Sequence, residues 1–248
     1  MCTTIIVSDL HLGASNSRAE DFLALLDTGF DRLILNGDTV DHHHILRYRE
    51  EHWRVLERLR MVARRREVIL IRGNHELRDR MAASTYGPHQ VLADMLDVPL
   101  REDYELHLGR RRFLVLHGDQ FDTTMNLTRL GDLADVFYRG VQQCSLGLAR
   151  WLKARTKRWC GVVDMVRRGA VAQAMTGGYD GVICGHTHFE EDSDQAGCRY
   201  LNTGSWVEQP CTYLRGQGDE LTLCDWKGSH SLHATPLLEP RPLVALAD

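Results

Sequence analysis

Five short apolar runs in this chain each lead directly into a cluster of Asp, Asn and His residues. The clusters read Asp9-x-His11, Gly37-Asp38-x-x-Asp41, Gly73-Asn74-His75-Glu76, His117-Gly118-Asp119 and Gly185-His186-Thr187-His188. In open α/β sheets, ligands bind in the crevice beyond the carboxyl ends of the strands. The pattern therefore predicts a single polar site assembled from segments that lie far apart in the sequence.

Strand-like and helix-like segments alternate through the first two thirds of the chain, which predicts βαβ units and an α/β protein with mixed sheets. Helical spacing is found at Arg18–Asp27, Ile45–Arg65 and His89–Leu96. The expected strands are Thr3–Val7, Arg32–Leu35, Val68–Ile71, Tyr104–Leu108, Arg112–Leu116, Gly181–Cys184, Cys198–Leu201, Thr212–Leu214 and Leu221–Trp226.

Composition limits the class of protein. With 248 residues, of which 43% are hydrophobic, the chain is long enough for one domain with a sizeable core, and we expect residues 1–248 to form it. A net charge of −4 excludes a wholly basic nucleic-acid binder. The 7 Cys include no C-x-x-C pair, which favours a reducing compartment over a disulfide framework. No signal peptide or run of about 20 apolar residues is seen, so the expected location is the cytoplasm or the cytoplasmic face of a membrane.

The spacing within the clusters favours metal binding. In an extended segment, residues i and i+2 point to the same side, so Asp9 can converge with His11, and His186 with His188. The clusters offer more oxygen and imidazole donors than one four-coordinate ion needs. They suit two ions about 3.5–4 Å apart, an arrangement that hydrolyses phosphate esters. Because no thiolate is among the donors, Mn²⁺, Fe or Zn²⁺ are all compatible, with Mn²⁺ preferred.

The order D-x-H, G-D-x-x-D, G-N-H-[DE], H-G and G-H-x-H resembles the calcineurin-like metallophosphoesterases, from about Asp9 to His188. The resemblance implies a four-layer αββα sandwich with a two-metal site at the rim of the strands. Two catalytic roles follow from it: His75 would be the non-ligand histidine beside the leaving group, and Asp41 would orient it. It also implies a first metal with a bridging Asp38, held by Asp9, His11, Asp38 and His188, and a second completed by Asn74, His117 and His186.

Further motifs resemble the UDP-2,3-diacylglucosamine pyrophosphatase branch, which cleaves a lipid-linked nucleotide pyrophosphate in lipid A synthesis. They are His117-Gly118-Asp119-Gln120-Phe121-Asp122 and Asn202-Thr203-Gly204-Ser205-Trp206. The expected partner is thus a phosphorylated small molecule or a lipid-linked nucleotide. Two alternatives stay open. One is a phosphodiesterase of the same superfamily acting on nucleotides or nucleic-acid ends. The other is a non-enzymatic scaffold, although every expected donor position is filled.

Residues 122–176 are expected to form a helical cap inserted into the domain, and residues 228–248 a C-terminal extension. From Arg139 to Arg168 the cap carries eight cations and one anion. A solvated helical face is one interpretation, and a docking surface for anionic lipid headgroups is another, because apolar residues alternate with the cations. Nucleic-acid binding is not favoured, since no known module is present. The expected substrate contacts are Arg139, Arg150, Lys153 and Arg155. His42, His43 and His44 are given no role.

Overall fold

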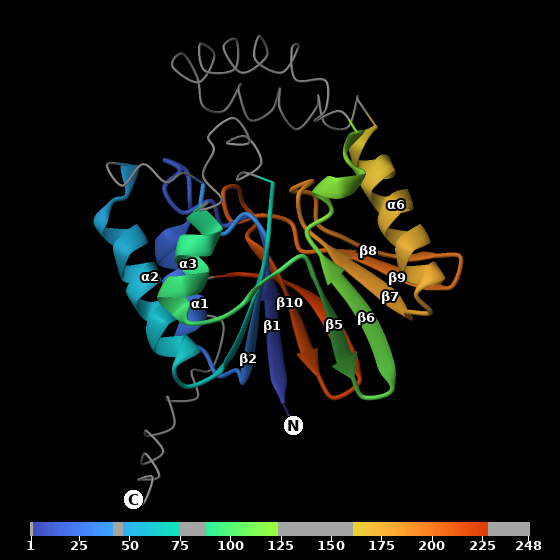
Figure 1. Cartoon of the computed structure of the whole chain (residues 1–248), viewed down its shortest axis with the longest axis horizontal. Coiled ribbons are helices and arrows are strands. Elements are labelled where there is room, and N and C mark those ends of the chain that lie inside the picture. The colour runs from blue at the N-terminus through green and yellow to red at the C-terminus, as the bar shows by residue number, and fades with distance from the viewer. Residues whose placement is uncertain (1, 42–46, 75–87, 124–160, 228–248) are drawn as a thin grey trace, which may run out of the picture.

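The computed structural model describes residues 2–41, 47–74, 88–123 and 161–227. Two sheets form its centre (Figure 1). The first has the order β11-β10-β1-β2-β3-β4, with bounds Thr3–Val7 (β1), Arg32–Asn36 (β2), Glu67–Ile71 (β3), Leu100–Arg101 (β4), Thr212–Gln217 (β10) and Glu220–Asp225 (β11). The second has the order β5-β6-β7-β9-β8, with bounds Asp103–Leu108 (β5), Arg111–Leu116 (β6), Gly181–Cys184 (β7), Glu191–Gln195 (β8) and Cys198–Asn202 (β9).

Each sheet has a parallel centre with antiparallel strands beside it. β1, β2 and β3 run parallel in the first sheet, while β10 and β11 pair antiparallel at its edge. In the second sheet β6, β7 and β9 run parallel, while β5 and β8 are antiparallel to their neighbours. The carboxyl ends of the parallel strands in each sheet therefore lie along one edge, where the clusters of Asp, Asn and His begin.

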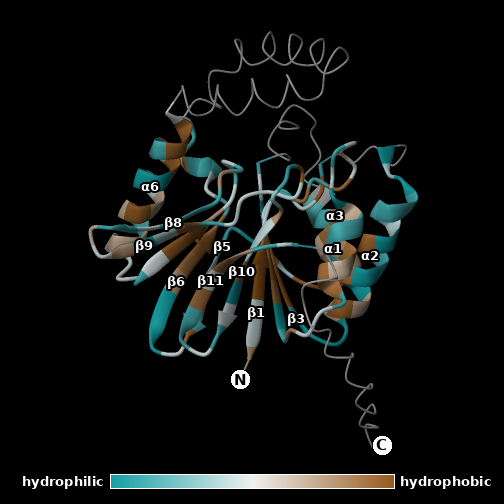
Figure 2. Ribbon diagram, turned by 180° about the vertical axis from the view of Figure 1, so that it is seen from behind, coloured by the Kyte–Doolittle hydropathy of each residue, from teal (hydrophilic) through white to brown (hydrophobic). Residues whose placement is uncertain are grey.

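The central strands are buried on both faces, which explains their continuous apolar sequences. Leu33 and Leu35 of β2 pack with the helices of one outer layer, whereas Ile34 packs between the two sheets. In the second sheet, Ile183 of β7 faces the first sheet, and Val182 packs with the helix on the other side. Figure 2 shows hydrophobic residues gathered in the strands, between the helical layers.

Four described helices form the outer layers (Figure 1). Helices α1 (Ala19–Leu26), α2 (Glu50–Ala63) and α3 (Pro88–Leu96) lie on the first sheet, and α6 (Val162–Thr176) lies on the second. These layers confirm the predicted α/β sandwich of mixed sheets. None of the helices in the described part of the chain is long and apolar enough to cross a membrane.

The expected cap and extension fall largely outside the described residues. Of the cap predicted at 122–176, residues 124–160 are not described, and neither is the extension at 228–248. The described end of that cap region is α6, whose Ala170 and Ala174 pack against Val182 and Tyr200 of the second sheet. Helix α6 is thus an outer layer of the sandwich itself.

Candidate metal centre

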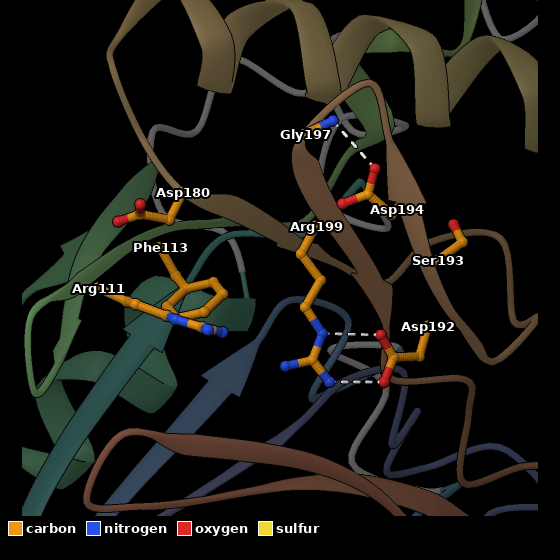
Figure 3. Close-up of a pocket in the computed structure, with 8 residues that line it drawn as sticks. All are labelled: Arg111, Phe113, Asp180, Asp192, Ser193, Asp194, Gly197 and Arg199. Carbon is orange, nitrogen blue, oxygen red and sulfur yellow. Dashed lines mark hydrogen bonds and ion pairs between the residues drawn. The ribbon is translucent and has the colours of Figure 1, made fainter.

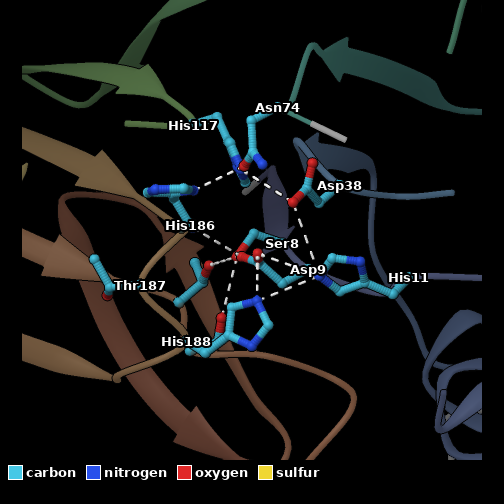
Figure 4. Close-up of polar contacts among 12 residues, drawn as sticks. Ser8, Asp9, His11, Asp38, Asn74, His117, His186, Thr187 and His188 are labelled. Carbon is cyan, nitrogen blue, oxygen red and sulfur yellow. Dashed lines mark hydrogen bonds and ion pairs between the residues drawn. The ribbon is translucent and has the colours of Figure 1, made fainter. Parts of the chain in front are cut away.

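The polar clusters meet at the carboxyl edge of both sheets (Figure 4). Backbone φ is positive at Asp9 (54°), His11 (45°), Asp38 (48°), His186 (63°) and His188 (64°). For residues other than glycine this conformation costs on the order of 1–3 kcal/mol each, and such strain gathers at functional sites. Backbone hydrogen bonds hold it in place: Asp9 donates to the Gly37 carbonyl at 3.1 Å, and His11 to the Asp38 carbonyl at 2.9 Å.

A first group of donors consists of Asp9, His11 and His188. Asp9 Oδ1 lies 3.1 Å from His188 Nε2 and 3.7 Å from His11 Nε2, and these two nitrogens are 3.3 Å apart. Ligands about 2.0–2.1 Å from a tetrahedral ion lie ~3.3 Å from one another. The three atoms are therefore spaced as the ligands of one ion would be.

The two oxygens of Asp9 have different surroundings. Oδ2 accepts hydrogen bonds from the Ser8 hydroxyl at 2.5 Å and from the His186 backbone N–H at 3.0 Å. Oδ1 is buried and makes no hydrogen bond of good geometry among the described residues; it faces His188 Nε2 at 3.1 Å and His11 Nε2 at 3.7 Å. A buried carboxylate needs positive charge beside it. Protons on the two imidazoles supply that charge without metal, and a cation between Oδ1 and the two nitrogens would supply it instead, so the donor set fits a metal.

A second group lies next to the first. Asp9, Asp38 and His117 each offer an atom within 4.8 Å of the others. His117 donates Nδ1–H to the Asn36 carbonyl at 2.9 Å, which leaves Nε2 facing the site, 3.3 Å from Asn74 Oδ1. His186 Nδ1 lies 2.8 Å from the same Asn74 oxygen.

Asp38 stands between the two groups. Its Oδ2 is 3.8 Å from His11 Nε2 and 3.4 Å from His117 Nε2. Asp9 also belongs to both groups. The structure thus brings together all of the expected ligands, which are Asp9, His11, Asp38, Asn74, His117, His186 and His188.

The carboxylates and imidazoles shift one another's protonation. Burial by itself would lower the pKa of His11, but hydrogen bonds with Asp41 and Asp9 raise it to about 9. Burial likewise opposes the charge on His117, yet the nearby Asp38 carboxylate raises its pKa to about 10. Burial would raise the pKa of Asp9, but the histidines around it, His188 first, hold it well below its usual value. Without metal, protons on the imidazoles balance the buried carboxylates.

The sequence pattern of the calcineurin-like phosphoesterases matches residues 2–190 of this chain. The chain belongs to this family. Members typically bind divalent metals, and Asp9, His11, Asp38 and His117 are candidate ligands here. A search of curated proteins found no match.

Several solved structures are distantly similar in fold. YfcE, a phosphoesterase from E. coli, is 20% identical, with 89% of this chain and 91% of that chain covered and a TM-score of 0.48. An archaeal phosphodiesterase is 15% identical, with 90% and 99% covered and a TM-score of 0.49. Vps29 from Entamoeba histolytica, complexed with Zn²⁺, is 16% identical, with 90% and 91% covered and a TM-score of 0.46.

The two residues expected to be catalytic are only partly described. Asp41 Oδ1 lies 3.3 Å from His11 Nδ1, so this carboxylate orients a candidate metal ligand. His75 lies outside the described residues, and its pairing with Asp41 stays a prediction. The expected substrate contacts Arg139, Arg150, Lys153 and Arg155 also lie outside the described part of the chain, as do His42, His43 and His44.

The sequence did not predict the residues that hydrogen-bond to the candidate ligands of this chain. The Ser8 hydroxyl bridges Asp9 and Thr203, whose Oγ1 is 2.6 Å away. Asn36 accepts from His117 through its backbone carbonyl. Asp122 Oδ2 lies 3.0 Å from His186 Nε2. Only Asp122 and Thr203 carried a signal in the sequence, because both fall in the motifs on which the resemblance to the diacylglucosamine pyrophosphatases rests.

A cavity of about 410 Å³ lies on the second sheet (Figure 3). It is lined by Arg111, Phe113, Asp180, Asp192, Ser193, Asp194, Gly197 and Arg199. Arg111 begins β6, whereas His117 follows the end of that strand, so this cavity is separate from the candidate metal centre. Within it, the Arg199 guanidinium donates two hydrogen bonds to the Asp192 carboxylate, from Nε to Oδ1 at 2.8 Å and from Nη2 to Oδ2 at 2.6 Å.

Proposed function

We propose that this protein is a phosphoesterase that uses two divalent metal ions to hydrolyse a phosphodiester or pyrophosphate bond. One observation carries the proposal: the buried Asp9 Oδ1 makes no hydrogen bond of good geometry among the described residues, and it faces the Nε2 atoms of His188 and His11 at the spacing of ligands around one ion. The adjoining second group, with Asp38 between the two, supports a dinuclear site.

In this proposal Asp9, His11, Asp38 and His188 hold the first metal, and Asn74, His117 and His186 complete the second with the shared Asp38. Mn²⁺ is the preferred metal, with Fe or Zn²⁺ as alternatives. When bound, the two ions would supply an activated water and neutralise the charge that develops on the phosphoryl oxygens.

The protein groups around that centre have their own tasks. Asn74 offers a neutral oxygen, so it adds no negative charge beside an anionic phosphate. The hydrogen bond from Ser8 to Asp9 Oδ2 leaves Oδ1 facing His188 and His11, where it would hold an ion. His75 would donate a proton to the leaving oxygen, and Asp41, which contacts His11, would orient His75 as well.

We further propose a lipid-linked nucleotide pyrophosphate of the UDP-2,3-diacylglucosamine type as substrate. Support comes from the sequence motifs, two members of which lie next to the candidate ligands: Asp122 contacts His186, and Thr203 contacts Ser8, which donates to Asp9. Arg139, Arg150, Lys153 and Arg155 would bind the substrate's phosphates or the anionic membrane surface. The reaction would then take place at the cytoplasmic face of a membrane, as part of lipid A synthesis.

Product analysis tests this proposal. Purified protein loaded with Mn²⁺ is incubated with UDP-2,3-diacylglucosamine and, separately, with an aryl phosphodiester, and the products are identified by mass spectrometry. UMP together with the lipid phosphate is the expected result. Turnover of the aryl phosphodiester alone would point to the nucleotide phosphodiesterase alternative. A protein with neither bound metal nor turnover would be a scaffold.

A pair of isosteric variants shows whether activity comes from this site. Asp38→Asn keeps the volume but removes the charge between the two metal groups, and should reduce turnover by at least 100-fold. Asp103→Asn makes the same change at an exposed position on β5 and should leave turnover unchanged. Full activity of the Asp38 variant would contradict the two-metal assignment.

A further inference from the structure

His186 is held differently from the other imidazoles of the site. His11 and His117 both turn Nε2 toward the site. Nδ1 of His11 faces Asp41, and Nδ1 of His117 faces the Asn36 carbonyl. His186 instead turns Nδ1 toward Asn74 Oδ1, at 2.8 Å. Its Nε2 faces away, 3.0 Å from Asp122 Oδ2. The ring of His186 is therefore reversed, and Asp122 occupies its outer side.

We propose that Asp122 is a positioning residue that fixes the orientation and the tautomer of His186 for the second metal. An ionised carboxylate can only accept a hydrogen bond, so when His186 is a neutral metal ligand its proton must lie on Nε2, beside Asp122. The lone pair would then be on Nδ1, which lies 2.8 Å from Asn74 Oδ1, as two ligands of one ion would. Such outer partners of a ligating histidine set its ring orientation and raise its basicity.

Burial makes this contact effective. The side chains of His186 and Asp122 are 5% and 6% exposed, so water competes weakly for either partner. Hydrogen bonds to a charged acceptor are also stronger than those to a neutral one. Loss of the carboxylate would remove this contact from the outer side of the His186 ring.

The fold places Asp122 through a short helical turn. Gly118, whose φ is 104°, leads from the end of β6 into the 3-10 helix Asp119–Phe121. Phe121 then packs against Gly169 of α6, where a Cβ would meet its ring at 2.4 Å. The Asp122 backbone N–H donates to the Asp119 carbonyl at 3.0 Å. Because helix α6 holds this turn in place, it also holds Asp122 beside Nε2 of His186.

This inference rests on the proposed two-metal centre, and Mn²⁺ binding tests it without any measurement of activity. Metal-free protein is titrated with Mn²⁺, and the unbound ion is measured by electron paramagnetic resonance to give the affinity of each site. In Asp122→Ala, binding at the second site should weaken about 10- to 100-fold, while the first site keeps its affinity. Gln120→Ala, an exposed change in the same turn, should bind as the wild type does.

Three outcomes separate the possibilities. Two sites of wild-type affinity in Asp122→Ala would overturn the positioning role and leave the proposed function intact. Wild-type protein that binds fewer than two ions would overturn both. If Asp122→Ala binds nothing because it does not fold, Asp122→Leu decides: it fills a similar volume without an acceptor, and an unchanged second affinity there would also overturn the proposal.

A spectroscopic signature adds a second readout. In Zn²⁺-loaded protein with ¹⁵N-labelled histidine, His186 should carry its ring proton on Nε2 and should show a metal-shifted Nδ1. A metal-shifted Nε2 in the wild type would contradict the assignment, because Asp122 could not then accept a proton from that nitrogen.

Discussion

At the scale of single residues, the backbone of Gly73 packs directly against the candidate bridging ligand Asp38. A Cβ added there would lie 2.1 Å from Asp38 Oδ1 and 2.3 Å from the Asp38 backbone nitrogen. Since backbone atoms cannot move aside cheaply, Gly73→Ala must displace Asp38. We expect the variant to lose Mn²⁺ binding and to be destabilised by about 1–3 kcal/mol, as overpacked sites are.

Gly29→Ala is the matched control, since an added Cβ at Gly29 meets no atom within 4 Å. Its urea midpoint and metal stoichiometry should equal those of the wild type. If Gly73→Ala bound two ions as well as Gly29→Ala does, Asp38 would tolerate displacement and its bridging position would be wrong.

The candidate ligands could be predicted because each follows the end of an apolar strand within four residues. Asp9 and His11 follow β1, and His186 and His188 follow β7, so strand order alone brings them to one edge. The partners of those ligands could not be predicted in this way. Ser8 and Asp122 act through hydrogen bonds whose lengths depend on how the turns are packed, and no sequence spacing encodes that distance.

At the scale of elements, Asn36 links β2 of the first sheet to the second sheet. Its side-chain Nδ2 donates to the Leu116 carbonyl at 3.1 Å and lies 3.5 Å from the Ile183 carbonyl, while its own carbonyl accepts from His117. Asn36→Ala keeps the backbone contact but leaves buried carbonyls without this donor. The free energy of unfolding should fall by about 1–3 kcal/mol.

Urea denaturation measures that loss. Asn16→Ala is the control, because Asn16 also donates to a carbonyl, that of Val207, but in a partly exposed place where water can replace it. The control should lose less than about 0.5 kcal/mol, as surface changes usually do. Equal losses in the two variants would mean that the link between the sheets adds no stability of its own.

Two elements differ from the sequence prediction, each for its own reason. β8, Glu191–Gln195, has alternating half-buried and exposed residues but no apolar residue, so it gave no strand signal. It forms because β9 offers an antiparallel partner at the sheet edge. Helix α2 begins at Glu50, later than the apolar pattern predicted from 45, because Arg49 and His52 form a cap at that point.

At the scale of the whole molecule, metal and protons compete for the same buried charge. Asp9 and Asp38 are almost fully buried, and without metal their charge is balanced by the imidazoles of His11 and His117, whose pKa values are raised to about 9 and about 10. Ligation requires these imidazoles to be neutral, so metal binding must release protons. Above the unfolded histidine pKa, the stability of the metal-free protein should therefore fall as pH rises, whereas that of the metal-loaded protein should change little.

The sign follows from linkage between protonation and folding. Between the unfolded histidine pKa near 6.5 and the folded values of about 9 and 10, the native metal-free chain binds protons that the unfolded chain does not. The stability that these two histidines give the metal-free protein is therefore complete below about pH 6.5. It falls as pH rises, by about 1.4 kcal/mol per pH unit for each histidine. In the metal-loaded protein, rising pH removes the competing protons, so metal binding adds more stability. The gap between the melting temperatures of Mn²⁺-loaded and chelator-treated protein should widen from pH 7 to pH 9.

Thermal unfolding at several pH values, with Mn²⁺ or with excess chelator, measures this gap. His11→Gln removes one of the two groups and should reduce the slope for the chelator-treated protein by about half. His107→Gln changes an exposed histidine on β5 and should leave the slope as it is. A gap that stays constant across this range would mean that His11 and His117 are already neutral without metal. The imidazoles could not then be balancing Asp9 and Asp38, and the buried carboxylates would need another source of positive charge before any ion arrives.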